Sequence, residues 1–376
     1  MSDAPISAAP ARTARFRLQE GGLLLVILLL GALLTLFGGT VKLPKFQLNA
    51  QGDRERVFIE KDGERVAQFE EKNKFLNAQN LAQLAKDTSF IAIMAVGATF
   101  IIISGGIDLS VGAIYALASV LGALVFHAYG PGGAHAGSPA LGAVLGMLTC
   151  VGTATLCGLA NGGMVVALRV HPFIITLGTM AIYRGIAFVI TKGQSIGEFP
   201  AAFRQLVQWE TAGGLTLVPL AVMLLVAAVG GTYLARLAMG RRIYAVGGNE
   251  LASRFSGIRV ERVKLSVFLY SGLTAGIAAL LALGYYGSAS SGDGAGYELD
   301  VIAAAVVGGA SLSGGKGTAL GALLGALVIK LIDNGIVILG IDQNYSRIII
   351  GVAVILAVVL DQLNDWLARR RLAKSA

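Results

Sequence analysis

The sequence predicts an all-α polytopic membrane protein with about ten transmembrane helices. Of its 376 residues, 55 % are hydrophobic and 14 % are charged, whereas roughly a quarter of the residues of a soluble domain are charged. This apolar excess is too large for one soluble core, but it suits helices of about 20 apolar residues. The 51 glycines fall mostly inside the apolar runs, which is typical of membrane helices that pack closely.

Ten apolar runs predict the individual spans. They are Gly21–Gly39, Ser89–Gly105, Leu109–Ala128, Leu141–Leu168, Phe173–Ile190, Leu215–Leu234, Leu265–Tyr285, Val301–Leu312, Thr318–Leu339 and Ile348–Leu363. The first run is longer than the apolar part of a signal peptide and lacks an A-x-A cleavage site, so we expect it to be retained as a span.

The distribution of Lys and Arg predicts the orientation, because positive residues are kept on the cytoplasmic side. Residues 236–264 carry seven basic and two acidic residues, and with ten spans they lie on the same side as both termini. We therefore expect cytoplasmic tails at 1–20 and 369–376, a transmembrane domain at 21–368 and a cytoplasmic loop at 236–264.

The segment 41–87 is expected on the opposite side, although it holds nine basic and eight acidic residues. At this length the charge rule loses force, and the charges nearly cancel. Within it, Asp62-Gly63 between strand-like residues indicates a β-hairpin over 57–72. Two interpretations stay open: an exposed hairpin without function, or a docking surface for an external protein.

Few ionisable residues fall inside the predicted spans, so each is informative. Arg184 lies in the fifth span, while Lys330 and Asp333 lie three residues apart in the ninth and can pair. We favour a structural pair over a proton relay. Cys150 and Cys157 are expected to share a helix face as small apolar residues, with no metal or redox role.

A glycine-rich turn is predicted between the second and third spans. Adjacent glycines end one helix and a polar side chain caps the next in the string that contains Gly105, Gly106, Asp108, Ser110 and Gly112. A similar string with Gly314 and Gly315 follows later in the chain and suggests a parallel internal repeat.

The second string must be tested as a nucleotide-binding loop, because Lys316 follows its glycines. A P-loop requires glycine where Ala310 stands and a hydroxyl residue where Gly317 stands. The match fails at both places, so we expect no ATP hydrolysis by this chain.

Residues 249–257 predict a short exposed helix in the cytoplasmic loop. Asn249 can cap its start, Glu250 favours its positive end, and Gly257 can stop it. Leu251 and Phe255 would then present a compact knob to a partner. The alternative is a helix on the lipid surface, with its basic residues on anionic headgroups.

Four strings carry a family resemblance: GGIDLSVG at 105–112, HPFIITLGTMAIYRG at 171–185, GGN at 247–249 and GYELDVIAAAVVGGASLSGGKGT at 296–318. They resemble the permease subunits of bacterial ATP-binding-cassette sugar importers, the ribose, xylose, arabinose and galactose permease family, over about residues 75–365. The resemblance implies a homodimeric or pseudo-dimeric channel in the bacterial inner membrane. A periplasmic sugar-binding protein would feed it, and a separate cytoplasmic ATPase, holding ATP and magnesium, would drive it.

The resemblance also implies that the loop between the sixth and seventh spans docks on the ATPase. The residues at those positions are Gly247, Gly248, Asn249, Glu250, Ala252, Arg254, Phe255 and Gly257. The long segment at 41–72 departs from the family, whose first external loop is usually shorter.

A sugar is too polar to cross hydrocarbon unaided, so a pathway needs weak polar contacts. The candidates within the spans are Ser110, Asn161, Thr176, Thr179 and Tyr183. The alternative is that they bond their own or neighbouring helices. Glycines repeated every fourth residue are expected to mark close packing, at Gly142/Gly146, Gly158/Gly162 and Gly317/Gly321/Gly325.

Other function classes are less favoured. The histidines, His127, His135 and His171, lie at span ends or in loops, so we expect no catalytic site, metal or cofactor in this chain. We expect its basic residues to contact membrane lipid, and we expect no nucleic-acid partner. A permease for nucleosides or branched-chain amino acids stays open, as does a membrane structural protein without transport activity.

Overall fold

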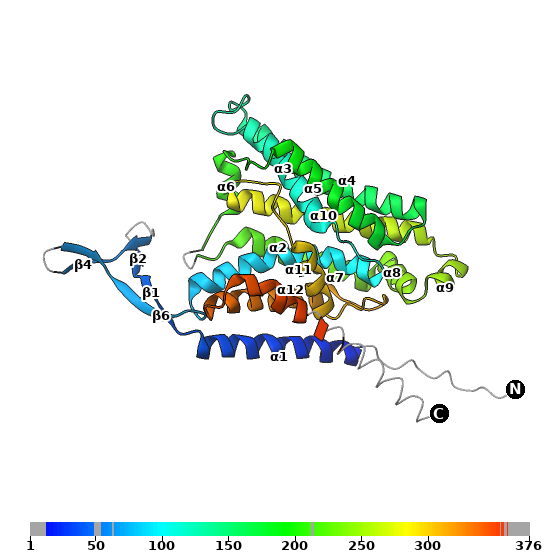
Figure 1. Cartoon of the computed structure of the whole chain (residues 1–376), viewed down its shortest axis with the longest axis horizontal. Helices are drawn as coiled ribbons and strands as arrows, with labels where there is room; N and C mark the ends of the chain where they lie inside the picture. Colours follow the sequence, from blue (N-terminus) through cyan, green and yellow to red (C-terminus); the bar gives the residue numbers. More distant parts are fainter. Residues whose placement is uncertain are drawn as a thin grey trace.

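The computed structural model describes residues 13–48, 54–61, 64–211, 214–353, 355–356 and 359, and its main body is a bundle of helices (Figure 1). The helices are α1 (Thr13–Phe37), α2 (Ala78–Ile103), α3 (Val111–Ala128), α4 (Pro139–Leu168), α5 (Pro172–Thr191), α6 (Ala201–Val207), α7 (Leu217–Arg236), α8 (Ala238–Gly248), α9 (Glu250–Phe255), α10 (Val260–Tyr286), α11 (Tyr297–Val307), α12 (Ala319–Ile338) and the 3₁₀ turn η1 (Gln343–Tyr345).

Eight helices in the described ranges are long and apolar enough to cross a membrane: α1, α2, α3, α4, α5, α7, α10 and α12. The expected count of ten is therefore not reached in those ranges. The run at Val301–Leu312 contributes only the last part of the 11-residue α11, which begins at Tyr297, and a turn at Gly308-Gly309. Eleven residues reach only about 16 Å, about half of a bilayer core. The run at 348–363 is helical up to 353 and then lies partly outside the described residues.

The bundle has two distinct ends. Helices α8 and α9 lie at one end, and the β-strands project from the other (Figure 1); we call these the α9 end and the strand end. Helix α1 begins at the α9 end, so the described start of the chain and residues 236–264 share that end. The predicted C-terminal tail, 369–376, lies outside the described residues.

The strands form a chain of antiparallel pairs at the strand end: β1 (Thr40–Pro44) with β6 (Phe69–Asn73), β2 (Phe46–Leu48) with β3 (Arg54–Arg56), and β4 (Phe58–Lys61) with β5 (Glu64–Ala67). The β4–β5 pair confirms the predicted hairpin. Its turn residues, Asp62 and Gly63, lie outside the described residues.

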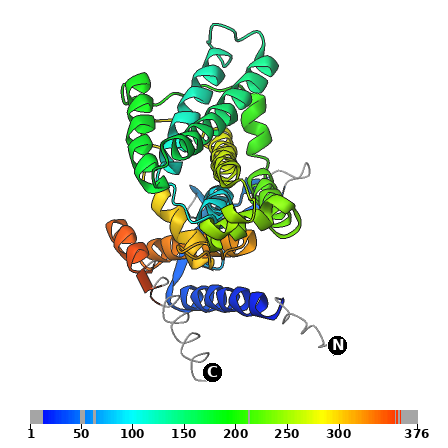
Figure 2. The ribbon, with the colours of Figure 1, turned by 90° about the vertical axis from the view of Figure 1, so that its right-hand side faces the viewer.

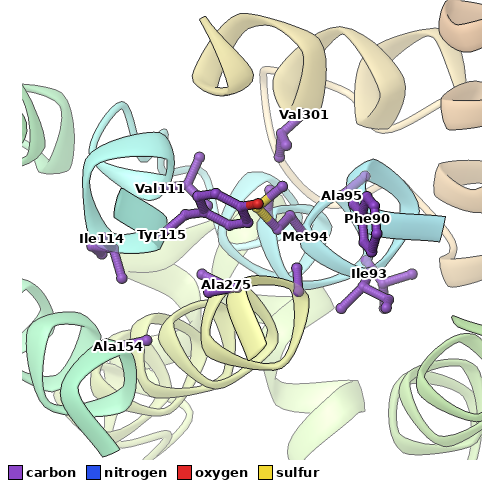
Figure 3. Packing of buried hydrophobic residues seen from close by; sticks show 14 of the residues in the cluster. Phe90, Ile93, Met94, Ala95, Val111, Ile114, Tyr115, Ala154, Ala275 and Val301 are labelled. Carbon is purple, nitrogen blue, oxygen red and sulfur yellow. The ribbon is translucent and has the colours of Figure 1, made fainter. Parts of the chain in front are cut away.

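Helix α2 forms the core of the bundle and is almost wholly buried. Met94 of α2 lies among Tyr115 of α3, Ala275 of α10 and Val301 of α11 (Figure 3). Seen from the α9 end, α3, α4 and α5 lie on one side of α10, and α11, α12 and α1 lie on the other (Figure 2).

The start of α2 differs from the prediction. The helix begins at Ala78, well before the expected Ser89, because the Asn77 side chain caps it by accepting from the N–H of Asn80. The predicted span began only after the charged Lys86, because a charge normally ends an apolar run. The Lys86 side chain is 3 % exposed and lies 4.0 Å from the centre of the Tyr285 ring, so the cation is stabilised by contacts within the fold.

The predicted glycine packing is confirmed. A Cβ at Gly158 of α4 would lie 2.9 Å from the Cα of Gly272 of α10, so the two backbones are in contact. On α12, a Cβ at Gly321 or Gly325 would meet the backbone of α11 at Gly308 or Ala304. These helices approach one another as closely as only glycine allows.

Candidate functional site

The predicted helix of residues 249–257 is present as α9 and is capped as expected. The Asn249 side chain accepts from the N–H of Ala252 at 2.9 Å, and Gly257 adopts a φ of 79° after the last turn. Leu251 is 63 % exposed and Phe255 83 % exposed. The helix therefore presents two apolar side chains, one turn apart, away from the bundle.

Ion pairs hold α9 against the start of α10. Arg254 donates to Glu261 at 2.6 Å and lies 3.5 Å from Glu250, while Lys264 donates to Glu250 at 2.8 Å. The hydrogen bond to Glu261 raises the pKa of Arg254, so this side chain keeps its charge. Two helices joined by several charges form a more rigid unit than one exposed pair would.

Helix α8 connects this unit to the interior through glycine backbones. A Cβ at Gly247 would meet the carbonyl oxygen of Ile103 at the end of α2 and lie 2.7 Å from the nitrogen of Gly315. The N–H of Gly315 donates to that same Ile103 oxygen at 2.8 Å. The hydroxyl of Tyr244 on α8 donates to the carbonyl of Gly317 at 2.7 Å.

The two glycine strings noted in the sequence thus meet in space. Ile103, two residues before Gly105, and the loop with Gly314 and Gly315 both meet Gly247 at the α9 end. We call the contact of Gly247 with Ile103 and Gly315 the glycine junction. It leaves no room for side chains, so a movement of α8 displaces α2 and the loop before α12 directly.

A cavity of about 830 Å³ lies beside α9. Its lining includes Gly105, Gly106, Arg169, Glu250, Arg254 and Lys264. The turn after α2, the α4–α5 turn and the α9–α10 unit therefore share one recess at the α9 end.

The segment between α2 and α3 is an unwound stretch inside the bundle. Gly105 has a φ of 84°, and both the N–H and the hydroxyl of Ser110 donate to Oδ1 of Asp108, at 2.8 and 2.6 Å. Neither side chain caps α3 in the expected way, because Ser110 makes no side-chain cap bond and the Asp108 carboxylate turns back onto Ser110.

Three of the five pathway candidates form one buried hydrogen-bond network beside this stretch, and a fourth, Thr176, bonds the backbone of the stretch itself. The Asn161 amide donates to the Ser110 hydroxyl at 2.7 Å, and the Tyr183 hydroxyl donates to Asn161 Oδ1 at 3.1 Å. Thr176 accepts from the N–H of Leu109 at 3.2 Å. Thr179 is also buried, but it bonds the Thr176 carbonyl of its own helix.

The structure adds partners to two charged residues for which the sequence showed none or only one. Arg184 of α5 donates to the carbonyl oxygens of Ser291 and Asp293 in the loop before α11. Lys330 pairs with Asp333 at 2.8 Å as predicted, and also with Asp300 of α11 at 2.9 Å. No local pattern could join Arg184 to Ser291 and Asp293, or Lys330 to Asp300, because these partners lie in distant parts of the chain.

Metal ligands do not gather in the described ranges, where no group of three His, Cys, Asp or Glu side chains could hold an ion. Cys150 and Cys157 are both buried and unpaired on α4. Burial on a helix among apolar neighbours fits the expected role as small apolar residues.

The sequence matches the family described as "Branched-chain amino acid transport system / permease component" over residues 80–358. This range covers α2 to the helical residues after η1, and it includes α9, the glycine junction and the Ser110 network.

Individual relatives agree with this match. The chain is 38 % identical to the ribose import permease protein RbsC of Escherichia coli (strain K12), over 76 % of this chain and 87 % of that protein. It is 37 % identical to the D-allose transport system permease protein AlsC of the same organism, over 77 % and 85 %. It is 31 % identical to the autoinducer 2 import system permease protein LsrD of Yersinia pseudotuberculosis serotype O:3 (strain YPIII), over 81 % and 91 %. No solved structure matches the chain.

Proposed function

The chain belongs to the family of permease components of branched-chain amino acid type transport systems, and from this premise we propose that it passes a monosaccharide across the bacterial inner membrane. It would do so as the membrane subunit of an ATP-binding-cassette importer. The observation that carries the proposal is the combination of spanning helices with relatives named as ribose and D-allose permeases, at 37–38 % identity over most of both chains.

The coupling role falls to α9. A separate ATPase would dock on Leu251 and Phe255, whose exposed apolar surface has no partner within the described chain. The ion pairs of Arg254 and Lys264 would hold α9 rigid while the ATPase moves it. The glycine junction would then pass this movement to α2 and α12. ATP and magnesium would be bound by the ATPase.

The pathway role falls to the unwound stretch between α2 and α3. A shift of α2 would displace Ser110 from Asn161, which also accepts from Tyr183, and would free polar groups that are satisfied in the present state. Sugar hydroxyls could use such groups in passing, because each lost protein hydrogen bond would be replaced by one to the sugar. Thr176 and Thr179 would line the neighbouring face of α5.

The assembly would contain a second permease subunit, which we expect to be a copy of this chain, and a periplasmic binding protein that delivers the sugar. Two copies would supply two α9 knobs for a dimeric ATPase, as the symmetry of closed oligomers requires.

Uptake into proteoliposomes tests the substrate class. The chain would be reconstituted with its ATPase and its binding protein, and supplied with labelled D-ribose, D-allose, D-galactose, leucine or a nucleoside. We expect ATP-dependent accumulation of at least one monosaccharide. Accumulation of leucine alone would instead support the activity in the family description, and no accumulation of any solute would favour a structural role.

A further inference from the structure

A second cavity, of about 470 Å³, lies at the strand end among α2, α10, α11 and α12; we call it the strand-end cavity. Its polar and aromatic lining includes Asn80, Asp87, Phe90, Tyr286, Tyr297 and Asn334. The volume is within the range of about 300–1,000 Å³ that small-molecule sites occupy. Tyr286 is 52 % exposed, so a solute can reach the lining from outside the bundle.

Aromatic rings form one side of the strand-end cavity. The centres of the Phe90 and Tyr286 rings are 6.1 Å apart, with an angle of 51° between the ring planes, and Tyr297 of α11 also lines the cavity. The C–H faces of a sugar ring are apolar while its edge carries hydroxyls, so aromatic surfaces beside polar groups complement both parts.

Amides form another side and are held in place by one another. Asn80 and Asn334 exchange two hydrogen bonds, at 3.2 and 2.7 Å, although they come from opposite halves of the chain. Gln83 donates to Asp87 at 2.9 Å. Asn80 uses both of its N–H donors, on Asn334 and on the Phe75 carbonyl. Each amide has two N–H donors and two lone pairs, so the pair keeps the second donor of Asn334 and one lone pair on each oxygen for a ligand, while the positions are already fixed.

The charges of the cavity disfavour an anionic ligand. Lys330 is paired with both Asp300 and Asp333, and Lys86 lies 3.5 Å from Asp87. Around the cavity the described carboxylates therefore outnumber the ammonium groups, and each of these lysines already has an acidic partner. An anionic group would meet carboxylates in place of a free cation, whereas hydroxyls can both donate to Asp and accept from amides.

We propose that the strand-end cavity binds a monosaccharide, as a neutral, small polyhydroxylated molecule, before it passes through the bundle. This inference rests on the proposed function and adds a location: the sugar contacts α2, α10 and α12 of a single subunit first. The permease itself then contributes to selection, because the amides and rings recognise hydroxyls and sugar faces.

Protection of an introduced cysteine tests the binding site directly. Val337 lines the cavity and is 56 % exposed, so Val337→Cys would place a thiol there without removing a ring or an amide. Leu339→Cys, near the end of the same helix and 40 % exposed but not in the cavity lining, is the matched control. The native Cys150 and Cys157 are buried, so a membrane-impermeant thiol reagent would report the new positions.

The measurement is the rate of thiol modification with and without D-ribose, D-allose or D-galactose, in the full assembly, with leucine as the comparison solute. At a sugar concentration of about nine times its Kd, we expect modification of Val337→Cys to slow about tenfold, and modification of Leu339→Cys to stay unchanged. Adding Tyr286→Ala should raise the sugar concentration needed by about threefold to tenfold, because one aromatic contact is lost.

The outcomes separate the site from the proposed function. Equal modification rates with and without a sugar that the assembly accumulates would overturn the site and leave the function standing. Protection by a sugar that is never accumulated would support the site and count against the function. Protection by leucine and by no sugar would overturn both.

Discussion

The same helices are joined differently at the two ends of the bundle. At the α9 end, the glycine junction joins α8, α2 and the loop before α12 through backbone atoms, with no side chain between them. At the strand end, α2, α10 and α12 are separated by a cavity lined with rings, amides and charges. The first arrangement transmits displacement, and the second offers groups that can recognise a solute. The same helices, α2 and α12, take part in both, so a movement at one end must affect the other.

The largest effect is expected from docking on α9. Phe255→Ala combined with Arg254→Glu removes the exposed ring and the ion pair with Glu261. Buried anchor side chains at interfaces contribute about 2 kcal/mol or more, so the affinity for the ATPase should fall about thirtyfold or more. Co-purification of the ATPase with the permease measures this.

The matched control places the same kinds of change at the other end. Phe69→Ala with Lys72→Glu removes an exposed ring and reverses a charge on β6, and it should leave ATPase binding unchanged. If the α9 variant retains the ATPase as well as the wild type does, α9 is not the docking surface.

The next effect concerns the glycine junction. Gly247→Ala places a methyl group against the Ile103 carbonyl and the Gly315 nitrogen, so α8 must shift. Overpacking of this kind costs about 1–3 kcal/mol, and ATP-driven uptake should fall more than ATPase binding does. Gly248→Ala, with nothing within 4 Å of the new Cβ, should behave as wild type. Equal thermal stability and uptake for the two variants would show that the junction transmits nothing.

A smaller effect is expected within the Ser110 network. Asn161→Leu removes the hydrogen bonds to Ser110 and Tyr183, and polar contacts between membrane helices contribute about 0.6 kcal/mol on average, up to about 1.7. Thr179→Val removes only a bond within α5, so it should change the melting temperature in detergent less. If Thr179→Val lowered the melting temperature more than Asn161→Leu, the Ser110 network would not be the stabilising contact.

The smallest effect on stability is expected at the strands. Lys45 and Gln68 already face each other next to the β1–β6 pair, with the N–H of Lys45 donating to the Gln68 carbonyl. Replacing residues 46–67 by Asn-Gly would close this pair with a two-residue turn. We expect an unchanged melting temperature. Uptake then decides between the two interpretations of the hairpin: a loss would indicate docking of the binding protein, and normal uptake would indicate no function.

The sequence allowed the spans and α9 to be predicted because their signals are local. Capping by Asn249 and the stop at Gly257 depend on neighbouring residues only, and the structure has both. The prediction that the apolar run at Val301–Leu312 is one span was wrong, because hydrophobicity does not show where the backbone turns. Hydrophobicity continues past Gly308, but the backbone turns at Gly309, with a φ of 91°, and returns as α12.

What could not be predicted depends on contacts between distant segments. Lys86 reads as a loop residue, yet Tyr285 and Tyr286 stabilise it inside the fold. The Asn80–Asn334 pair and the Asp300–Lys330 pair also join segments far apart in the chain. For this reason the strand-end cavity was not visible in the sequence, while the pathway candidates on α3, α4 and α5 were identified singly but not as one network.

The most direct test of the account is ATP hydrolysis in the reconstituted assembly, measured with the sugar-loaded binding protein present, in the wild type and in Phe255→Ala. The account predicts that loaded binding protein stimulates hydrolysis in the wild type, and that this stimulation is lost in Phe255→Ala while the variant inserts and melts normally. Full stimulation in Phe255→Ala would contradict coupling through α9.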